Sequence, residues 1–439
     1  MVVKNDVTMA DDILDGVPMN VAPPKAGWRS KVPIMACGAG LFSDGYLNGI
    51  IGVVNTILIR MWKDEYGPDK QRVVTSIGFT GIILGQLSFG FIVDKYSRKT
   101  GMLASSIILV TFSILASLAK GVGPRVQGIG IILSTIMPII LLVAFGENEL
   151  EKVWRTALGL GAIFPTMIFW LRLFLDEGEQ FKTNNLRKVK SIPWKLIMKY
   201  YWRRLLVCST IWLIHNLSAF SFTLYSSYII ELVTGGEQSL LKTFGGNSCI
   251  MLFRLPGSII GSFVSDKLGP QRTLAIGIWC QAIMGYIMAG CFPKLKENSV
   301  AFICVFGLFI MFSEFGPGNN IGLVAAKSSA TAIRGKFYGL AAATGKLGGF
   351  VGTFFFDTIV QKCGGKTTNR GMAAPFYISS SLGIFAGCLA VFCLPSLGQD
   401  AVQDEDVLFK SHLLANGFDM DRDDEDQRNS ELGELNKGI

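Results

Sequence analysis

Charged residues are scarce in this chain. They make up 17% of its 439 residues, against about 25% in soluble domains. Charge is nearly absent from stretches of about 20 residues, the length of a bilayer-crossing helix, and gathers in the segments between them. Half of the residues are hydrophobic, and the mean hydropathy is +0.42. This distribution excludes a series of ordinary soluble domains and predicts an all-α protein that crosses a lipid bilayer many times.

Several functional signatures are also absent. The nine cysteines form no C-x-x-C pair and lie mostly in apolar runs, which indicates packing rather than disulfides or a metal site. We find no nucleophile–base pair, phosphate-binding loop or cofactor motif, and so expect no enzyme activity and no cofactor. The net charge of +8 comes from Lys and Arg beside apolar segments, so it indicates topology and not a nucleic-acid partner. The first 30 residues lack a signal-peptide core.

Apolar segments predict eleven membrane spans. They lie near residues 34–60, 73–94, 101–119, 126–146, 157–175, 205–233, 247–265, 273–292, 299–320, 335–360 and 373–395. The segment after the fifth span carries eight cations and no acid beyond Glu179, so the positive-inside rule places it in the cytosol. The predicted parts are a cytosolic N-terminal segment (1–30), an N-terminal helix bundle (31–175), a basic cytosolic loop (176–204), a six-helix C-terminal bundle (205–396) and an acidic, disordered cytosolic tail (397–439).

The count of eleven conflicts with this topology. The basic loop at 94–99 and the central segment should both face the cytosol, yet three spans between them would put them on opposite sides. Residues 125–146 either fail to cross the membrane or join the remains of two helices. The alternative is an ordinary helix, with the charge rule broken by a short loop. The eight uncompensated cations favour the first interpretation, in which about one helix is missing from the N-terminal half.

A charged motif follows the second span. Residues 90–99 read GFIVDKYSRK, which resembles the G-x-x-x-D-[RK]-x-G-R-K signature of the major facilitator superfamily, with Ser97 in place of a glycine. A similar pattern follows a span of the second half, and this repetition is typical of transporters with two related bundles. The resemblance implies two helix bundles on a twelve-helix plan. The acids would accept hydrogen bonds at the terminus of a neighbouring helix and so form a conformational latch; an ordinary charged loop is the alternative. The predicted latch residues are Gly90, Asp94, Arg98, Lys99, Asp266 and Arg272.

Three further segments narrow the resemblance. Residues 44–50 (DGYLNGI), 315–319 (FGPGN) and the glycine-rich run from Arg334 to Gly349 are similar to the phosphate:proton symporter family, and more closely to its fungal glycerophosphoinositol and glycerophosphocholine permeases. This resemblance implies uptake of an anionic phosphate ester, driven by protons, through alternating access across the plasma membrane. We expect the protein to be a monomer.

The chain departs from that family at two places. Arg125 and residues 128–130 match the start of the family's fourth helix, but Ile131 follows where the family has a Gly-Glu-Tyr or Gly-Asp-Tyr motif, so about one helix of sequence is missing. On the span after the central loop, the family's Trp, Asp and Tyr correspond to Trp212, Asn216 and Phe220. Because Asn cannot titrate, we expect no proton coupling through Asn216. Phe220 lacks the hydroxyl that would bind a phosphate oxygen.

Charges at membrane depth are site candidates because each is costly without a cavity or a partner. They are Asp44, Arg254, Glu314 and Lys346. Arg and Lys complement a phosphate, so the predicted substrate-binding residues are Trp212, Asn216, Arg254, Asn319 and Lys346. The predicted proton-coupling residues are Asp44 and His215. As alternatives, His215 is simply packed, Arg254 and Lys346 pair with structural acids, and residues 316–318 only break their helix.

Three functions remain open from the sequence. The first is a proton-linked importer of glycerophosphodiesters or inorganic phosphate. The second is a transporter-like protein that serves as a sensor or is inert, which the missing helix and Asn216 favour. The third is a carrier of sugars or other organic solutes, which would not need Arg254 or Lys346.

Overall fold

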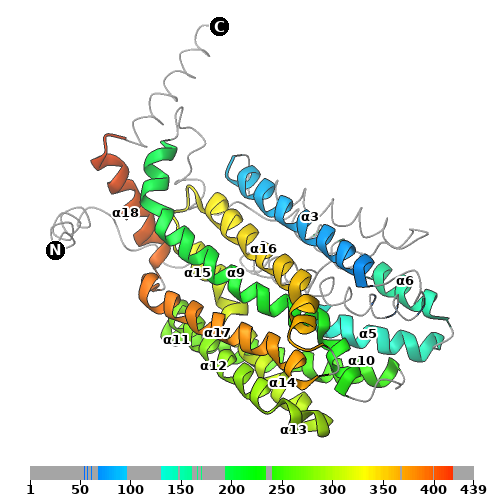
Figure 1. The fold of residues 1–439 in the computed structure, drawn as a ribbon. Helices are drawn as coiled ribbons and strands as arrows, with labels where there is room; N and C mark the ends of the chain where they lie inside the picture. The colour runs from blue at the N-terminus through cyan, green and yellow to red at the C-terminus, as the bar shows by residue number, and fades with distance from the viewer. Residues whose placement is uncertain are drawn as a thin grey trace, which may run out of the picture.

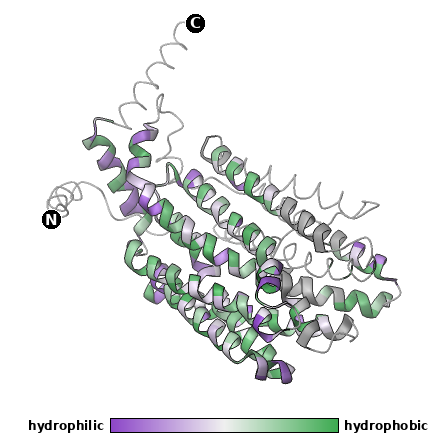
Figure 2. Ribbon diagram, in the orientation of Figure 1, coloured by the Kyte–Doolittle hydropathy of each residue, from purple (hydrophilic) through white to green (hydrophobic). Residues whose placement is uncertain are grey.

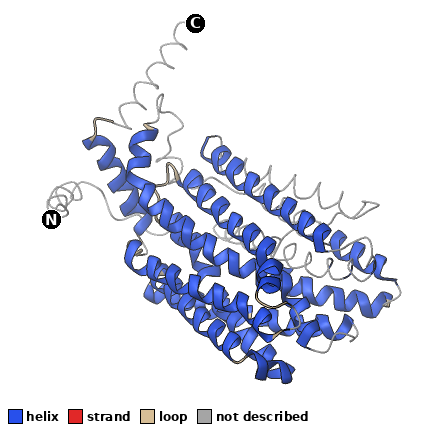
Figure 3. Cartoon of the chain, viewed as in Figure 1, coloured by secondary structure: helices blue, strands red, loops and turns tan. Residues whose placement is uncertain are grey.

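The computed structural model describes residues 68–95, 130–146, 149–160, 193–233, 240–365, 368–398 and 400–418, with single positions at 54, 57, 61, 166 and 170. All regular structure in these residues is helical (Figure 3). The predicted span 101–119 and nearly all of 34–60 lie outside the described residues. The candidate residues Asp44, Arg98 and Lys99 lie outside them too.

Three helices are described in the N-terminal half (Figure 1). Helix α3 (Pro68–Lys95) contains the predicted span 73–94. The described part of helix α5 runs from Gly130 to Phe145. Helix α6 (Leu150–Leu160) follows it and carries its charges toward its start, with Arg155 bonded to Glu151 at 2.7 Å.

Six helical segments occupy residues 193–398. They are α9 (Trp194–Val233), the pair α10 (Leu240–Leu252) and α11 (Arg254–Leu268), α12 (Pro270–Gly290), the pair α14 (Ser299–Ser313) and α15 (Asn319–Lys327) joined by the π-helix η2 (Glu314–Gly318), α16 (Arg334–Lys362) and α17 (Asn369–Cys393). A short helix, α13 (Phe292–Glu297), precedes α14. Among the described residues, five helices are long and apolar enough to cross a membrane. Figure 2 shows hydrophobic residues along these helices and hydrophilic ones at α13, α18 and the start of α9.

Helix α9 begins well before the predicted span, so the basic loop predicted over 176–204 is helical from Trp194 onward. Hydropathy alone misses these turns because they are amphipathic. Ile197 and Tyr201 are buried, whereas Arg203 on the same segment is exposed. The first turns of α9 therefore extend the span as a partly polar helix.

The predicted disordered tail is wrong for its first part. Residues Ala401–Ala415 form helix α18, which lies beside the start of α9 (Figure 1). Glu405, Phe409 and Leu413 are buried, and their four-residue spacing puts them on one helix face. Acidic composition suggested disorder, but this buried face gives the segment a surface to pack on.

Helix α16 lies between α9 and α3 and touches both closely. Its glycines make this possible, as small residues do at contacts between membrane helices. Methyl groups added at Gly348 or Gly352 would overlap carbonyl oxygens of α9, and one at Gly339 would lie 2.8 Å from the Gln86 carbonyl oxygen of α3. The α3–α16 contact therefore joins the two halves of the chain.

A second contact between the halves pairs α5 with α10. In two repeated bundles related by a two-fold axis, a contact between the second helix of one half and the fifth helix of the other implies the same contact with the halves exchanged. Helix α3 is the second predicted span of the first half, and it contacts α16, the fifth span of the second half. Helix α10 begins the second span of the second half, so its partner α5 takes the place of a fifth helix. Helix α5 thus makes the contact of a fifth helix, although it is only the fourth predicted span.

Phenylalanines fill the interior of the C-terminal bundle. Phe222 of α9 stacks on Phe376 of α17 with 4.4 Å between ring centroids, and Phe306 and Phe309 of α14 pack edge-on around them. Edge-on and stacked aromatic pairs add stability beyond the area they bury. This cluster fixes α9, α14 and α17 relative to one another.

Candidate functional site

The predicted latch residues lie at two surfaces of the described structure. Gly90 of α3 faces the start of α16, where an added methyl would lie 2.9 Å from the Gly335 carbonyl oxygen and 3.2 Å from Gly339 Cα. Asp94 lies one turn further along α3. In the second half, Asp266 and Arg272 are exposed on either side of the turn between α11 and α12. The structure therefore places Gly90 in a contact between the halves and leaves Asp266 and Arg272 at the surface.

The predicted substrate face of α9 packs on neighbouring helices. Trp212 is 9% exposed, and a methyl at Gly345 of α16 would lie 2.5 Å from its ring. Asn216 is buried, and its amide nitrogen has no hydrogen-bond partner among the described residues. Phe220 packs edge-on against Phe79 of α3, with ring centroids 5.1 Å apart. Asn216 is thus a buried polar side chain with hydrogen-bonding capacity left.

Lys346 of α16 lies at the junction of the two halves. Its ammonium nitrogen is 4.5 Å from the centroid of the Phe220 ring, which is a cation–π distance. One turn further along α16, a methyl at Gly349 would touch both Phe220 and Phe79. Lys346 therefore lies where α3, α9 and α16 meet, and not out at a lipid-facing end.

Arg254 and Glu314 form an ion pair between α11 and η2. The second terminal nitrogen of Arg254 donates to Thr223 Oγ1 of α9 at 2.7 Å. The side chains are 13% and 23% exposed. Arg254 and Lys346 both lie within electrostatic range of His215, so the three residues belong to one region of the C-terminal bundle. The sequence offered a structural acid as an alternative partner of Arg254, and the structure shows that this acid is Glu314 and that Thr223 joins the pair.

The chain matches a family of transporters. The family model described as "Sugar (and other) transporter" matches residues 32–129 and 178–398. The chain belongs to this family. A glycerophosphocholine permease of Candida albicans is 37% identical over 95% of this chain and 87% of its own length. A glycerophosphodiester transporter of the same organism is 38% identical over 90% of this chain and 84% of its own length.

Solved structures agree on the fold. A proton:xylose symporter of the major facilitator superfamily is 13% identical and superposes with a TM-score of 0.65, over 87% of this transporter and 99% of the symporter. The predicted major facilitator fold is thereby confirmed. The transporter is a multi-pass membrane protein of this superfamily.

Asn319 ties two helices of the transporter together. Its amide nitrogen donates to the Ser258 carbonyl oxygen of α11 at 2.8 Å, and its amide oxygen accepts from Ser258 Oγ at 3.1 Å. Next to it, Asn320 donates to the Gly316 carbonyl oxygen at 2.9 Å, a group near Pro317 in η2. These bonds stabilise the irregular turn, as expected where a proline interrupts a membrane helix. In this structure the amide of Asn319 is occupied by α11.

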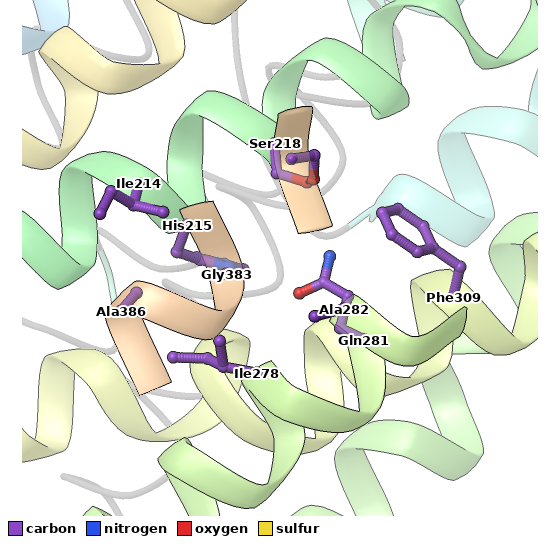
Figure 4. A pocket seen from close by; sticks show the side chains of 10 residues that line it. Ile214, His215, Ser218, Ile278, Gln281, Ala282, Phe309, Gly383 and Ala386 are labelled. Atoms are coloured by element: carbon purple, nitrogen blue, oxygen red, sulfur yellow. Dashed lines mark hydrogen bonds between the residues drawn. The ribbon is translucent and has the colours of Figure 1, made fainter. Parts of the chain in front are cut away.

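A small cavity lies inside the C-terminal bundle of the transporter, between α9, α12, α14 and α17 (Figure 4). The space open to the centre of a water molecule is about 20 Å³, which is enough for about one water. His215 Nδ1 and Gln281 Nε2 have no hydrogen-bond partner among the described residues, whereas Ser379 donates to Ser218 at 2.7 Å. His215 therefore lines a cavity with both polar and apolar walls, and one of its ring nitrogens has no partner among the described residues.

Metal binding has no support in the described residues. They contain no group of three or more His, Cys, Asp or Glu side chains that could hold a metal ion. The cysteines described are free. The candidate site in the C-terminal bundle therefore consists of the cations Arg254 and Lys346, the carboxylate of Glu314 and the polar side chains of α9.

Proposed function

We propose that this protein is a secondary transporter that imports glycerophosphodiesters, such as glycerophosphocholine or glycerophosphoinositol, and also inorganic phosphate, together with protons. Two relatives with 37% and 38% identity are a glycerophosphocholine permease and a glycerophosphodiester transporter. The observation that carries the proposal is the pair of cations, Arg254 and Lys346, held at membrane depth in one region. Intramembrane cations are costly and mark substrate pathways, and a phosphodiester supplies the negative charge that they would bind.

The proposal assigns roles to the remaining candidates. Arg254 and Lys346 bind the phosphate group, with Trp212, Asn216 and Asn319 supporting the substrate. Asp44 and His215 take part in proton coupling. The two bundles move against each other about the α3–α16 contact in alternating access. We place the protein in the plasma membrane as a monomer.

Uptake measurements test this function. Cells without their own permeases would express the chain, with surface delivery confirmed, and take up labelled glycerophosphocholine, glycerophosphoinositol or phosphate at acidic and neutral outside pH. We expect acid-stimulated uptake of at least one of them. Absence of uptake by surface-expressed protein contradicts the proposal.

Charge-neutral variants test the two cations. A hydrogen bond to a charged group contributes about 1.5–3 kcal/mol, so Arg254→Gln or Lys346→Gln should raise KM about tenfold to a hundredfold. Lys362→Gln is the matched control, because Lys362 is an exposed lysine at the end of the same helix as Lys346. If the chain carries sugars instead, both cation variants should leave uptake unchanged.

A second candidate is a transporter-like chain that does not transport. The family model leaves residues 130–177 unmatched, and the alignment with the glycerophosphocholine permease spans 474 positions, more than this chain of 439 residues has. Together with the position of α5 in the contact of a fifth helix, this favours loss of the fourth helix. Insertion of the permease's corresponding segment after Gly130 tests the idea: uptake that appears only in the chimera supports an inactive chain, and equal uptake by both excludes it.

A further inference from the structure

The ion pair of Arg254 and Glu314 lies deep in the membrane. Glu314 is near the middle of the span Ser299–Lys327, and Arg254 is near the middle of the span Thr243–Leu268. Both side chains are mostly buried. A buried charge that loses its partner is strongly unfavourable, so each of these two groups constrains the charge state of the other.

Close backbone packing holds the pair in place. Methyl groups added at Gly257 or Gly261 of α11 would overlap the carbonyl oxygens of Met311 and Phe315, so α11 and the α14–η2 segment touch directly. The carboxylate of Glu314 lies against Gly318, where an added methyl would be 2.5 Å from Oε2. The Arg254 side chain is anchored separately by Thr223. The two charged groups therefore have little freedom to find other partners within the bundle.

Both partners lie at irregular points of their spans. Arg254 is the first residue of α11, directly after the break at Phe253 that separates it from α10. Glu314 is the first residue of the π-helix η2, which also contains Pro317. Single π-turns inside α-helices occur frequently at functional sites. Two helix irregularities that meet at one ion pair indicate a functional site rather than a packing contact alone.

We propose that Glu314 is a proton-coupling residue that exchanges its bond with Arg254 for a proton when a phosphate ester binds. This inference rests on the proposed function. Arg254 is the cation that contacts Glu314 in the described structure. When the phosphodiester takes the place of the carboxylate on the guanidinium, Glu314 loses that counter-ion. A carboxylate left at membrane depth becomes neutral by taking up a proton, which here bonds to a carboxylate oxygen.

The charges balance through the cycle. Before binding, the guanidinium and the carboxylate sum to zero. After binding, the guanidinium and the phosphodiester anion sum to zero, and the protonated Glu314 is neutral. When the substrate leaves on the other side of the membrane, Arg254 returns to the carboxylate and the proton is released there. One proton therefore moves with each phosphodiester group.

The surroundings of Glu314 fit this role. Arg254 is the charged group in contact with it among the described residues. The neighbouring elements present uncharged groups: Gly277 of α12 lies against Gly316, Asn319 of α15 is bonded to α11, and Thr223 of α9 binds the arginine. Lys346 and His215 belong to the same region. Arg254 is thus the counter-ion that Glu314 would have to exchange.

Proteoliposomes with a trapped pH dye test the proposal. Wild-type protein should acidify the lumen when glycerophosphocholine or glycerophosphoinositol is added outside, and it should also exchange labelled for unlabelled substrate. In Glu314→Gln, we expect acidification to fall to the level of empty liposomes while exchange continues, since the amide can leave Arg254 but carries no proton. Glu314→Asp should restore acidification. Glu297→Gln, which changes an exposed glutamate of α13, should behave as wild type.

The outcomes separate the two hypotheses. A wild-type protein that exchanges none of the substrates contradicts the proposed function itself. Exchange together with undiminished acidification in Glu314→Gln overturns only the role of Glu314, and loss of acidification in Asp44→Asn alone would then assign coupling to Asp44.

If Glu314→Gln does not fold, a measurement on the wild-type protein still tests the proposal. Infrared difference spectra of the wild-type protein should show a protonated carboxylic acid appearing when substrate binds, and the band should shift in Glu314→Asp. A spectrum without such a band, or with one that this substitution leaves in place, overturns the proposal.

Discussion

The contact at Gly90 allows a direct test of the conformational equilibrium. A single methyl group, introduced by Gly90→Ala, would lie 2.9 Å from one backbone atom of α16 and 3.2 Å from another. Neither atom belongs to a flexible side chain, so α3 and α16 must separate at this point. In alternating access the same two helices separate when the bundles rock, so the substitution should favour the other state.

The size of the effect follows from the packing. Overpacking a close contact costs about 1–3 kcal/mol, and this cost applies only in the state where α3 and α16 touch. The gain in helix stability from replacing glycine by alanine is about 0.5–1 kcal/mol, but it applies to α3 in both states and cancels. We therefore expect the population ratio to shift by about 5- to 150-fold.

Distance measurements between spin labels provide the assay. Labels at Phe91 of α3 and Leu340 of α16 are suitable because both positions adjoin the contact. Their side chains are 57% and 41% exposed. Gly90→Ala should move the distance distribution toward longer values. Gly85→Ala is the matched control, since a methyl there meets nothing within 4 Å.

One result would refute the reasoning. If Gly90→Ala is folded and gives the same distance distribution as Gly85→Ala, the contact at Gly90 does not open during the cycle. The latch predicted from residues 90–99 would then be an ordinary charged loop at the end of a helix.

Three further substitutions test the stability of the C-terminal half, each followed by thermal unfolding of purified protein in detergent. Glu405→Ala removes a buried carboxylate that accepts hydrogen bonds at 2.7 and 2.6 Å from α9, and should cost about 3 kcal/mol, whereas the exposed neighbour Asp404→Ala should cost little. Gly348→Ala drives a methyl into the backbone of α9 and should cost about 1–3 kcal/mol, but Gly245→Ala, with open space around it, should not. Asn298→Ala removes the cap of α14, which accepts from two backbone N–H groups, and should cost about 1 kcal/mol.

Composition and hydropathy were sufficient for the class of protein. Long uncharged runs can satisfy their backbone groups in lipid only as helices. The structure has helices at all six segments predicted to be spans in the C-terminal half, and five of them are long and apolar enough to cross a membrane, α16 being the exception. The repeated charged loops identified the superfamily, and the fold and family are confirmed. The helix predicted to be missing remains a prediction, which the contact of α5 with α10 favours.

Local signals failed where burial depends on distant residues. The start of α9 and the helix α18 are polar enough to suggest loop and disorder, but each buries one face against the other. Tyr201 of α9 donates to Glu405 at 2.7 Å, across more than 200 residues of chain. A pattern within either segment cannot reveal that partner.

The sequence by itself determined that the chain crosses a membrane as helices, because backbone groups in lipid leave no other choice, and which charges lie at membrane depth, where each is costly. Only the tertiary structure decided how those charges are paired. Arg254 and Glu314 are separated by 60 positions, and the sequence offered Arg254 a structural acid as a partner without indicating which one. Their ion pair exists because glycines at the α11–η2 contact let the two backbones touch, a three-dimensional condition that spacing along one helix does not encode.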